Sequence, residues 1–213
     1  MTHTSKSAII PSFVILLVVS LSAGCFTLKK QYPEKHLFVL DVAQKQNTQA
    51  PNPGTVLTVR PFRISPQYEG RGLIYRKKDL NYEIDFYNEF LIPPAALVTE
   101  QVSVWLKSAG IFEYVTDTSS RLMATHSLEG LVVALYGDYS KVQSAEAVLQ
   151  LQLILLDETA ARPRPVFERT YRKTAPIPRG SAEELVQGWN NALRQILEDF
   201  EKDVRQKISL EKP

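Results

Sequence analysis

The segment from Val148 to Leu156 constrains the fold more than any other part of this sequence. Leucine occupies every second position from Leu149 through Leu151 and Leu153 to Leu155, and Gln150 and Gln152 lie between the first three leucines. Because successive side chains of a strand point to opposite faces, this alternation predicts a strand with one apolar face. A second strand is predicted from Leu128 to Asp138, joined to the first by a turn-rich segment. We therefore expect an antiparallel hairpin with one face on a core and the other in solvent.

Two other segments have the periodicity of amphipathic helices. Pro93 and Pro94 open the first, and Gly110 is expected to end it in the left-handed conformation. Ser181 and Glu184 have the spacing of a capping box at the start of the second. The apolar positions of the first are Val98, Val102, Trp105, Leu106 and Ala109, and those of the second are Leu185, Trp189, Ala192, Leu193, Ile196, Phe200 and Val204. The outer face of the second carries acid–base pairs four residues apart, which favours a solvated face over a partner-binding one: Glu198 with Lys202, Glu201 with Arg205 and Asp203 with Lys207.

Further short strands complete the expected fold. They are predicted at residues 37–42, 55–60, 112–115 and 166–175, and the last is polar and basic enough for a sheet edge. Strands together with two helices predict the α+β class, with a mostly antiparallel sheet and two main helices packed on one face. A chain of 213 residues is long enough for one such domain.

The N-terminal region contains the single cysteine of the chain, Cys25, after an apolar run from Ala8 to Leu21. This run is shorter than the roughly 20 apolar residues of a membrane span, and small residues occupy positions 22–24. The arrangement resembles a bacterial lipoprotein signal, in which Cys25 becomes the lipidated first residue of the mature chain, although Ser22 stands where an aliphatic residue is usual. The alternatives are an ordinary cleaved signal, or a buried helix with a free thiol.

This interpretation divides the chain into four parts. Residues 1–24 form the lipoprotein signal peptide, 25–36 a tether, 37–208 a single α+β domain and 209–213 a tail. Phe26 follows the cysteine, where lipoproteins retained at the inner membrane often carry Asp. We therefore expect the mature protein at the periplasmic face of the outer membrane, held by its lipid.

Motifs of the common enzyme classes are absent from the sequence. It has no Gly-rich phosphate loop, no H-E-x-x-H motif and no G-x-S-x-G nucleophile elbow. His36 and His126 lack a second ligand at metal spacing, and Glu83 and Asp85 are a common pair for one strand face. Since 25 Lys+Arg balance 23 Asp+Glu, the charge does not favour nucleic acid. The sequence predicts no enzyme, no metal, and no cofactor besides the lipid on Cys25.

Aromatic residues are concentrated between Gly70 and Pro94. Five lie within sixteen residues, whereas aromatic residues make up 9% of the chain: Tyr75, Tyr82, Phe86, Tyr87 and Phe90. The segment either ties a strand pair to the following helix or forms an interface or lipid-facing surface. On the second interpretation, the candidate partner-binding residues are Tyr75, Arg76, Tyr82, Tyr87 and Phe90.

The segment from Leu73 to Arg76, the spaced tyrosines and the pair Pro93–Pro94 resemble the signature of the ABC-type transport auxiliary lipoprotein family (PqiC-like, DUF330). The resemblance covers nearly the whole mature chain, with Phe90 where members often carry tryptophan. It implies a non-catalytic periplasmic domain, lipid-anchored at the outer membrane, that docks to a mammalian-cell-entry (MCE) protein. With an ABC permease and ATPase, that protein moves lipids or organic solvents between membranes. Self-association into a homo-oligomer is also compatible with the resemblance.

Two other hypotheses remain open. A small tethered α+β domain can instead regulate cell-wall or envelope-assembly enzymes. An enzyme with an inconspicuous site would need a cleft lined by Glu83, Asp85 or His126, with strongly shifted pKa values.

Overall fold

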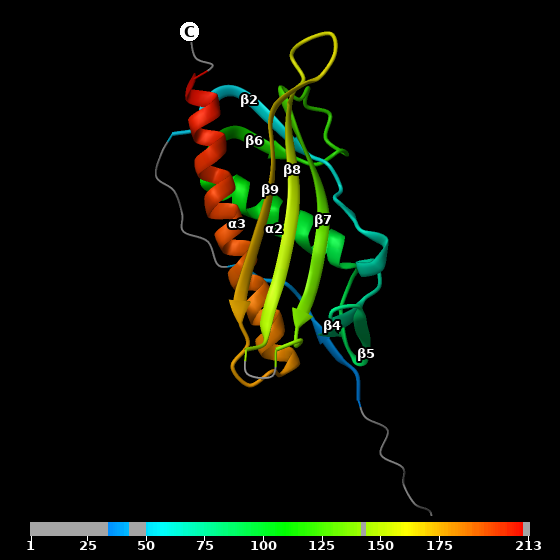
Figure 1. The fold of residues 1–213 in the computed structure, drawn as a ribbon. Coiled ribbons are helices and arrows are strands. Elements are labelled where there is room, and N and C mark those ends of the chain that lie inside the picture. The colour runs from blue at the N-terminus through cyan, green and yellow to red at the C-terminus, as the bar shows by residue number, and fades with distance from the viewer. Residues whose placement is uncertain (1–33, 43–49, 142–143, 211–213) are drawn as a thin grey trace, which may run out of the picture. The chain divides into compact units, whose positions relative to one another are not determined.

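The computed structural model describes residues 34–42, 50–141 and 144–210 of the chain. The predicted signal peptide, Cys25 and most of the predicted tether lie outside these residues. Within the described part, nine strands join in one sheet, accompanied by two α-helices (Figure 1).

The three longest strands lie side by side: β7 (His126–Asp138), β8 (Glu146–Asp157) and β9 (Arg164–Pro176). Strand β8 lies between the other two and is antiparallel to both, which confirms the predicted hairpin. The predicted alternation is also confirmed, because the four leucines of β8 are each 0% exposed. Strand β9 pairs with β8 alone and is therefore an edge strand, as predicted.

The other edge of β7 is shared by three strands: β2 (Asn52–Val59), β3 (Arg63–Ile64) and β4 (Gly72–Lys78). They run parallel to β7 and pair in succession with its beginning, its middle and its end. A strand of 13 residues is about 40 Å long. Strands β2 and β4 therefore lie far apart in the sheet, each beside one end of β7.

Each of these two strands carries an extension of the sheet. Strand β6 (Phe112–Thr116) lies parallel to β2, whereas β5 (Asn81–Phe90) is antiparallel to β4 and pairs with β1 (His36–Phe38) in parallel. The sheet is therefore mixed, with antiparallel long ladders and mostly parallel short ones. The predicted α+β class is confirmed.

Strand β1 is shorter than the sequence indicates, because it has only three residues although a strand is predicted to Val42. Beyond it, the backbone follows the helices. The N–H of Asp41 donates to Oδ1 of Asn190 at 3.0 Å, and that of Val42 donates to Oε1 of Gln101 at 2.9 Å. Side chains of the two helices thus replace a neighbouring strand as hydrogen-bond partners.

Helix α2 (Pro94–Ala109) ends as predicted, since Gly110 has a φ of 60° in the left-handed region. Helix α3 (Ala182–Leu210) extends into the predicted tail. Oγ of Ser181 accepts the N–H of Glu184 at 3.2 Å, which is half of the predicted capping box. The Glu184 carboxylate reaches further back than a capping box requires, to the N–H of Arg179 at 2.7 Å.

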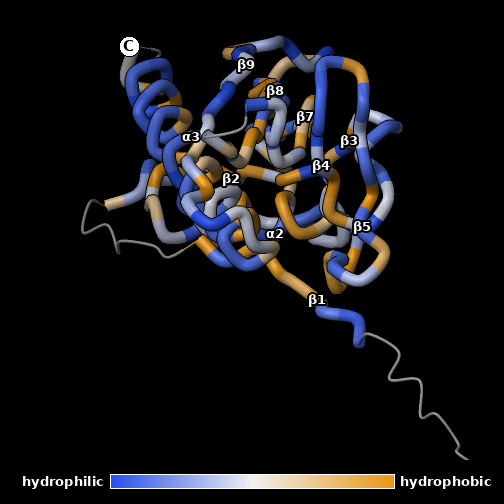
Figure 2. The backbone as a smooth tube through the Cα atoms, turned by 60° about the horizontal axis from the view of Figure 1, so that its bottom comes forward, coloured by the Kyte–Doolittle hydropathy of each residue, from blue (hydrophilic) through white to orange (hydrophobic). Residues whose placement is uncertain are grey.

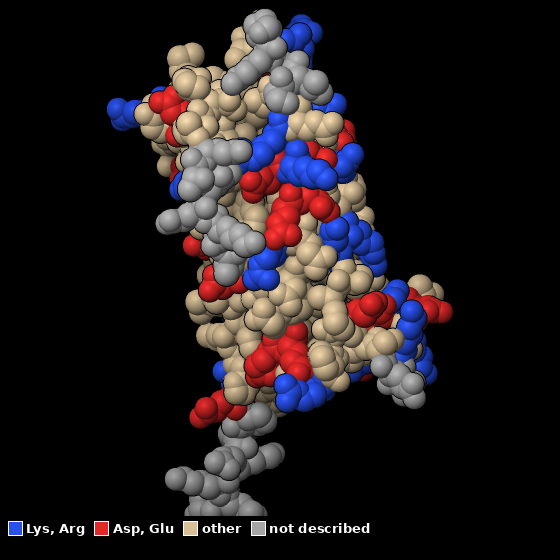
Figure 3. Space-filling model, turned by 90° about the vertical axis from the view of Figure 1, so that its left-hand side faces the viewer, with Lys and Arg blue, Asp and Glu red and all other residues tan. Residues whose placement is uncertain are grey.

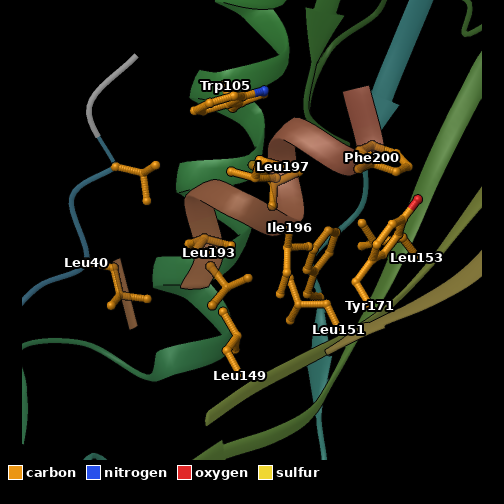
Figure 4. Close-up of a cluster of buried hydrophobic side chains, with 14 of the residues drawn as sticks. Leu40, Trp105, Leu149, Leu151, Leu153, Tyr171, Leu193, Ile196, Leu197 and Phe200 are labelled. Carbon is orange, nitrogen blue, oxygen red and sulfur yellow. The ribbon is translucent and has the colours of Figure 1, made fainter. Parts of the chain in front are cut away.

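Both helices pack on the leucine face of the central strands. Figure 4 shows Leu193, Ile196, Leu197 and Phe200 of α3 between Trp105 of α2 and the leucines of β8. Trp189 is 0% exposed, and its Nε1–H donates to the carbonyl oxygen of Val148 at 3.2 Å. Each aliphatic side chain buried here contributes roughly 1.5–3 kcal/mol relative to exposure.

The outer face of α3 differs in part from the prediction. Glu201 and Arg205 form the expected pair at 2.9 Å, but Asp203 accepts from Arg169 and from the hydroxyl of Tyr171, both on β9 and both at 2.6 Å. On the side of the molecule that Figure 3 presents, acidic and basic side chains are interspersed. Among the described helices, none has the length and apolarity needed to cross a bilayer.

Candidate functional site

The aromatic segment forms the β4–β5 hairpin, which projects from the C-terminal end of β7. Tyr75 and Arg76 of β4 are in register with Gly137 and Asp138, the last residues of β7. Beyond Arg76, β4 continues past the end of β7 to the turn at Asp79 and Leu80, from which β5 returns. Its side chains fall into a set that fixes the hairpin to the domain and a set that faces outward.

Arg76 and Asp138 form an ion pair at the base of the hairpin. Nε of Arg76 donates to Oδ1 of Asp138 at 3.1 Å, a second guanidinium nitrogen binds Oδ2, and Oγ of Ser140 donates to Oδ1 at 2.6 Å. Burial alone would raise the pKa of Asp138, but the hydrogen bonds from Arg76 and Ser140 outweigh it and lower the pKa to about 2. Asp138 therefore stays ionised and holds β4 on β7.

Tyr75 is fixed by a second contact, on the side of the hairpin that faces Tyr139. Its hydroxyl donates to Oδ2 of Asp85 at 2.8 Å, and its ring meets that of Tyr139 edge to face at 5.4 Å. Burial and the Asp85 carboxylate raise the pKa of Tyr75. Burial would also raise the pKa of Asp85, but hydrogen bonds from Asn88, Tyr75 and Tyr87 hold it below its ordinary value.

Tyr82 lies on the opposite side, against a second apolar cluster. Its ring meets that of Tyr136 edge to face at 5.7 Å, and Tyr68 of the 3-10 helix η1 (Pro66–Tyr68) stacks on Tyr136 at 6.1 Å. This cluster contains Tyr68, Ile74, Ala134, Tyr136 and Val148. It covers part of the sheet face that the sequence predicts to be solvated, which corrects that expectation.

Phe90 belongs to the core and not to the surface. It is 2% exposed, and its ring centre lies 5.5 Å from that of Trp189. The expectation that Phe90 binds a partner is therefore corrected: its ring ties the end of β5 to α3. Tyr75 and Arg76 are half-buried, whereas Tyr82 and Tyr87 are 42% and 41% exposed.

A bulge in β5 directs other side chains outward. The register passes from Ile74 opposite Ile84 to Gly72 opposite Glu89, so β5 has extra residues between these pairs. Oδ1 of Asp85 accepts the N–H groups of Tyr87 and Asn88 at 2.8 and 3.0 Å and so stabilises the bulge. Phe86 is 70% exposed, and its ring meets that of Tyr87 at 5.2 Å.

Sequence reasoning did not identify the exposed apolar side chains of this hairpin as a group. Leu80 is 96% exposed and Ile84 is 70% exposed. The sequence signal that could have indicated the bulge is Asp85. An aspartate side chain can accept the backbone N–H two residues later, here that of Tyr87, and so favours a local turn.

A shallow groove of about 420 Å³ runs along the Tyr75 side of the hairpin. Its lining includes Tyr75, Lys77, Asp85, Tyr87 and Tyr139. The ammonium group of Lys77 lies 5.4 Å from the ring centre of Tyr75 and 5.2 Å from that of Tyr139. The groove thus offers tyrosine rings, one cation and the carboxylates of Glu83 and Asp85 to a partner.

Of the residues considered for an enzyme, Glu83 and Asp85 both line this shallow groove, whereas His126 does not. Asp85 stabilises the bulge, Glu83 pairs with Lys77 at 3.5 Å, and His126 lies at the other end of β7, against Phe112 at 5.4 Å. Within the described residues, no three His, Cys, Asp or Glu side chains form a group that could hold a metal. Cys25, the predicted lipidation site, lies outside these residues.

Comparison with solved structures identifies the fold. Protein XCC0632 from Xanthomonas campestris, of the family model DUF330, superposes with a TM-score of 0.72 and 15% sequence identity over 82% of this chain and 97% of that protein. An uncharacterised protein superposes with a TM-score of 0.61 and 15% identity, over 80% of this chain and 99% of its own. No family model and no curated protein matches the sequence. The chain is an α+β protein, and its fold is that of a DUF330 protein.

Proposed function

We propose that this chain is an ABC-type transport auxiliary lipoprotein: a non-catalytic, lipid-anchored component of an MCE-associated system that transports lipids or organic solvents between membranes. The observation that carries the proposal is the fold, which matches a DUF330 protein over 97% of that protein's length. The resemblance of residues 73–76 and Pro93–Pro94 to the family signature supports it independently.

The proposed anchor is a lipid on Cys25, at the periplasmic face of the outer membrane. A single acyl chain holds a protein weakly, whereas several acyl chains on one cysteine hold it firmly. Lys35 lies ten positions after Cys25, and ten residue steps of extended chain reach at most about 35 Å. The lipid would therefore confine the folded domain to the neighbourhood of the membrane.

The proposed docking surface for the MCE protein is the part of the β4–β5 hairpin that carries Tyr75, Arg76, Tyr82 and Tyr87. Tyr82 and Tyr87 present partly exposed rings, while Tyr75 and Arg76 are fixed by Asp85 and Asp138. Rings held in one conformation lose little entropy on binding, which is why tyrosine is enriched at interfaces. The domain would act by holding the MCE protein beside the membrane, without a chemical step of its own. A homo-oligomer of this chain is compatible with the proposed docking of the MCE protein.

The test is co-purification of the MCE protein with tagged full-length protein from detergent-solubilised envelopes. We expect the wild type to retain the MCE protein and the double variant Tyr82→Ser/Tyr87→Ser to lose most of it. Tyr114→Ser is the matched control, because Tyr114 is a 51% exposed tyrosine on β6, near the other end of β7. Recovery of no MCE protein with abundant wild-type bait, or of cell-wall synthases in its place, would overturn the proposal.

A further inference from the structure

Exposed apolar side chains gather on one part of the described domain. Nine of its thirteen exposed large apolar residues lie on β1, the β4–β5 hairpin and the residues that flank them. Those nine, here called the apolar edge, are Leu37, Val39, Leu80, Tyr82, Ile84, Phe86, Tyr87, Leu91 and Ile92. Soluble domains rarely concentrate exposed apolar area in this way unless the surface contacts something.

Basic side chains accompany this apolar edge. The ammonium group of Lys35 lies 4.8 Å from the ring centre of Phe86 and 3.3 Å from a carboxylate oxygen of Glu89. Arg71 binds Glu89 at 3.2 Å and the carbonyl oxygen of Leu91 at 3.1 Å. Aromatic and aliphatic side chains next to Lys and Arg are the combination that favours the boundary between lipid headgroups and acyl chains.

The chain also enters the domain at this edge. Strand β1 begins at His36 and pairs with β5, so that Leu37 lies opposite Glu89. Figure 2 shows β1 and β5 at the same corner of the molecule, with hydrophobic positions on both. A lipid on Cys25 would keep Lys35 within about 35 Å of the membrane, and Lys35 is itself in contact with Phe86. The edge is thus the part of the domain that the tether holds nearest to the bilayer.

We propose that the apolar edge, apart from Tyr82 and Tyr87, which remain assigned to the MCE protein, contacts the lipid surface in which Cys25 is anchored. The inference rests on the proposed lipid anchor and adds a second membrane contact to it. Leu80, at the tip, and Phe86, on the bulge, enter the headgroup region, while Lys35 and Arg71 meet lipid phosphates. The contact would fix the orientation of the domain, so that the start of β7 points away from the membrane.

The test uses full-length lipoprotein in vesicles of phosphatidylethanolamine and phosphatidylglycerol, with a polarity-sensitive fluorophore on one introduced cysteine. Labelling is specific, because Cys25 is the only native cysteine and its thiol carries the lipid in the proposed mature protein. The probe sites are Leu80→Cys and Phe86→Cys. Met123→Cys is the matched control, because Met123 is 91% exposed and precedes the start of β7.

We expect the fluorophores at 80 and 86 to emit at shorter wavelength and to be quenched by spin-labelled lipids, with probe depths of about 5–10 Å below the headgroup surface. The fluorophore at 123 should remain aqueous. Equal exposure to water at 80, 86 and 123 on vesicle-bound protein would overturn the inference. So would protection at 80 and 86 that grows with protein density at constant lipid, because this would assign the edge to a second copy. Failure of the protein to float with vesicles would instead refute the anchor and hence the proposed function.

Discussion

The ion pair of Arg76 with Asp138 should stabilise the domain, because it joins the β4–β5 hairpin to the end of β7. Replacing Asp138→Asn removes the anion at nearly constant volume, and Arg76→Gln removes the cation. A double-mutant cycle of these two changes isolates their coupling free energy from the individual effects of each substitution. Asp79→Asn, in the exposed turn of the same hairpin, is the control and should change the stability by less than about 0.5 kcal/mol.

The magnitude follows from the pKa of Asp138. Burial would raise this pKa, but hydrogen bonds from Arg76 and Ser140 lower it from 3.8 to about 2. At about 1.4 kcal/mol per pKa unit, the shift limits the stabilisation to about 2.5 kcal/mol. Since 27% of the Arg76 side chain is exposed and Ser140 shares the carboxylate, we expect a coupling of about 1–2 kcal/mol.

The pH dependence has a definite sign. A carboxyl group whose pKa is lower in the folded state stabilises that state above its unfolded pKa, so the coupling is complete at pH 7. It declines as the pH falls below about 4 and is mostly lost near the folded pKa of about 2.

Chemical unfolding followed by circular dichroism at pH 7 and about pH 3 measures the coupling at both values. At pH 7 the variant Asp138→Asn should unfold about 3–6 °C below the wild type in a thermal scan. At about pH 3 the coupling should fall to roughly half. Purely additive single effects at pH 7, or a coupling that is unchanged in acid, would refute this account of the hairpin base.

Two further substitution pairs test the packing. Phe90→Ala should cost about 3–5 kcal/mol in chemical unfolding because the ring is buried on Trp189, whereas Phe86→Ala should cost less than about 0.5 kcal/mol; similar losses for both would contradict the core placement of Phe90. Gly188→Ala should lower the melting temperature despite the helix propensity of alanine, because a Cβ there would lie 2.6 Å from that of Ala147. We expect a net loss of about 1–3 kcal/mol, whereas Gly70→Ala, with no atom within 4 Å of its Cβ, should be neutral; equal effects would show that α3 does not pack this closely on β8.

The elements with strong periodicity could be predicted from the sequence. The leucine alternation of β8, the stripe of α2 and the glycine that ends α2 are local signals, and each determines its element without knowledge of the neighbours. The partners of the short strands could not be predicted in the same way. Strands β2, β3 and β4 share one edge of β7, and nothing in a two-residue strand such as Arg63–Ile64 indicates a parallel partner nearly 70 residues away.

The site was predicted as a segment but not as a surface. Aromatic enrichment identified the hairpin, but it does not distinguish Phe90, which packs on Trp189, from Phe86, which is 70% exposed. Strict alternation would place both phenylalanines on the same face. The bulge at Asp85 changes the face to which the following residues belong, and its hydrogen bonds to Tyr87 and Asn88 depend on the folded backbone.

Attachment through Cys25 underlies both the proposed docking role and the proposed lipid contact. The most direct test is mass spectrometry of the N-terminal peptide from protein isolated with the outer-membrane fraction. We predict a mature chain that begins at Cys25 and carries a diacylglyceryl group on its sulfur. A chain that begins at another residue, or a Cys25 with a free thiol, would contradict the account.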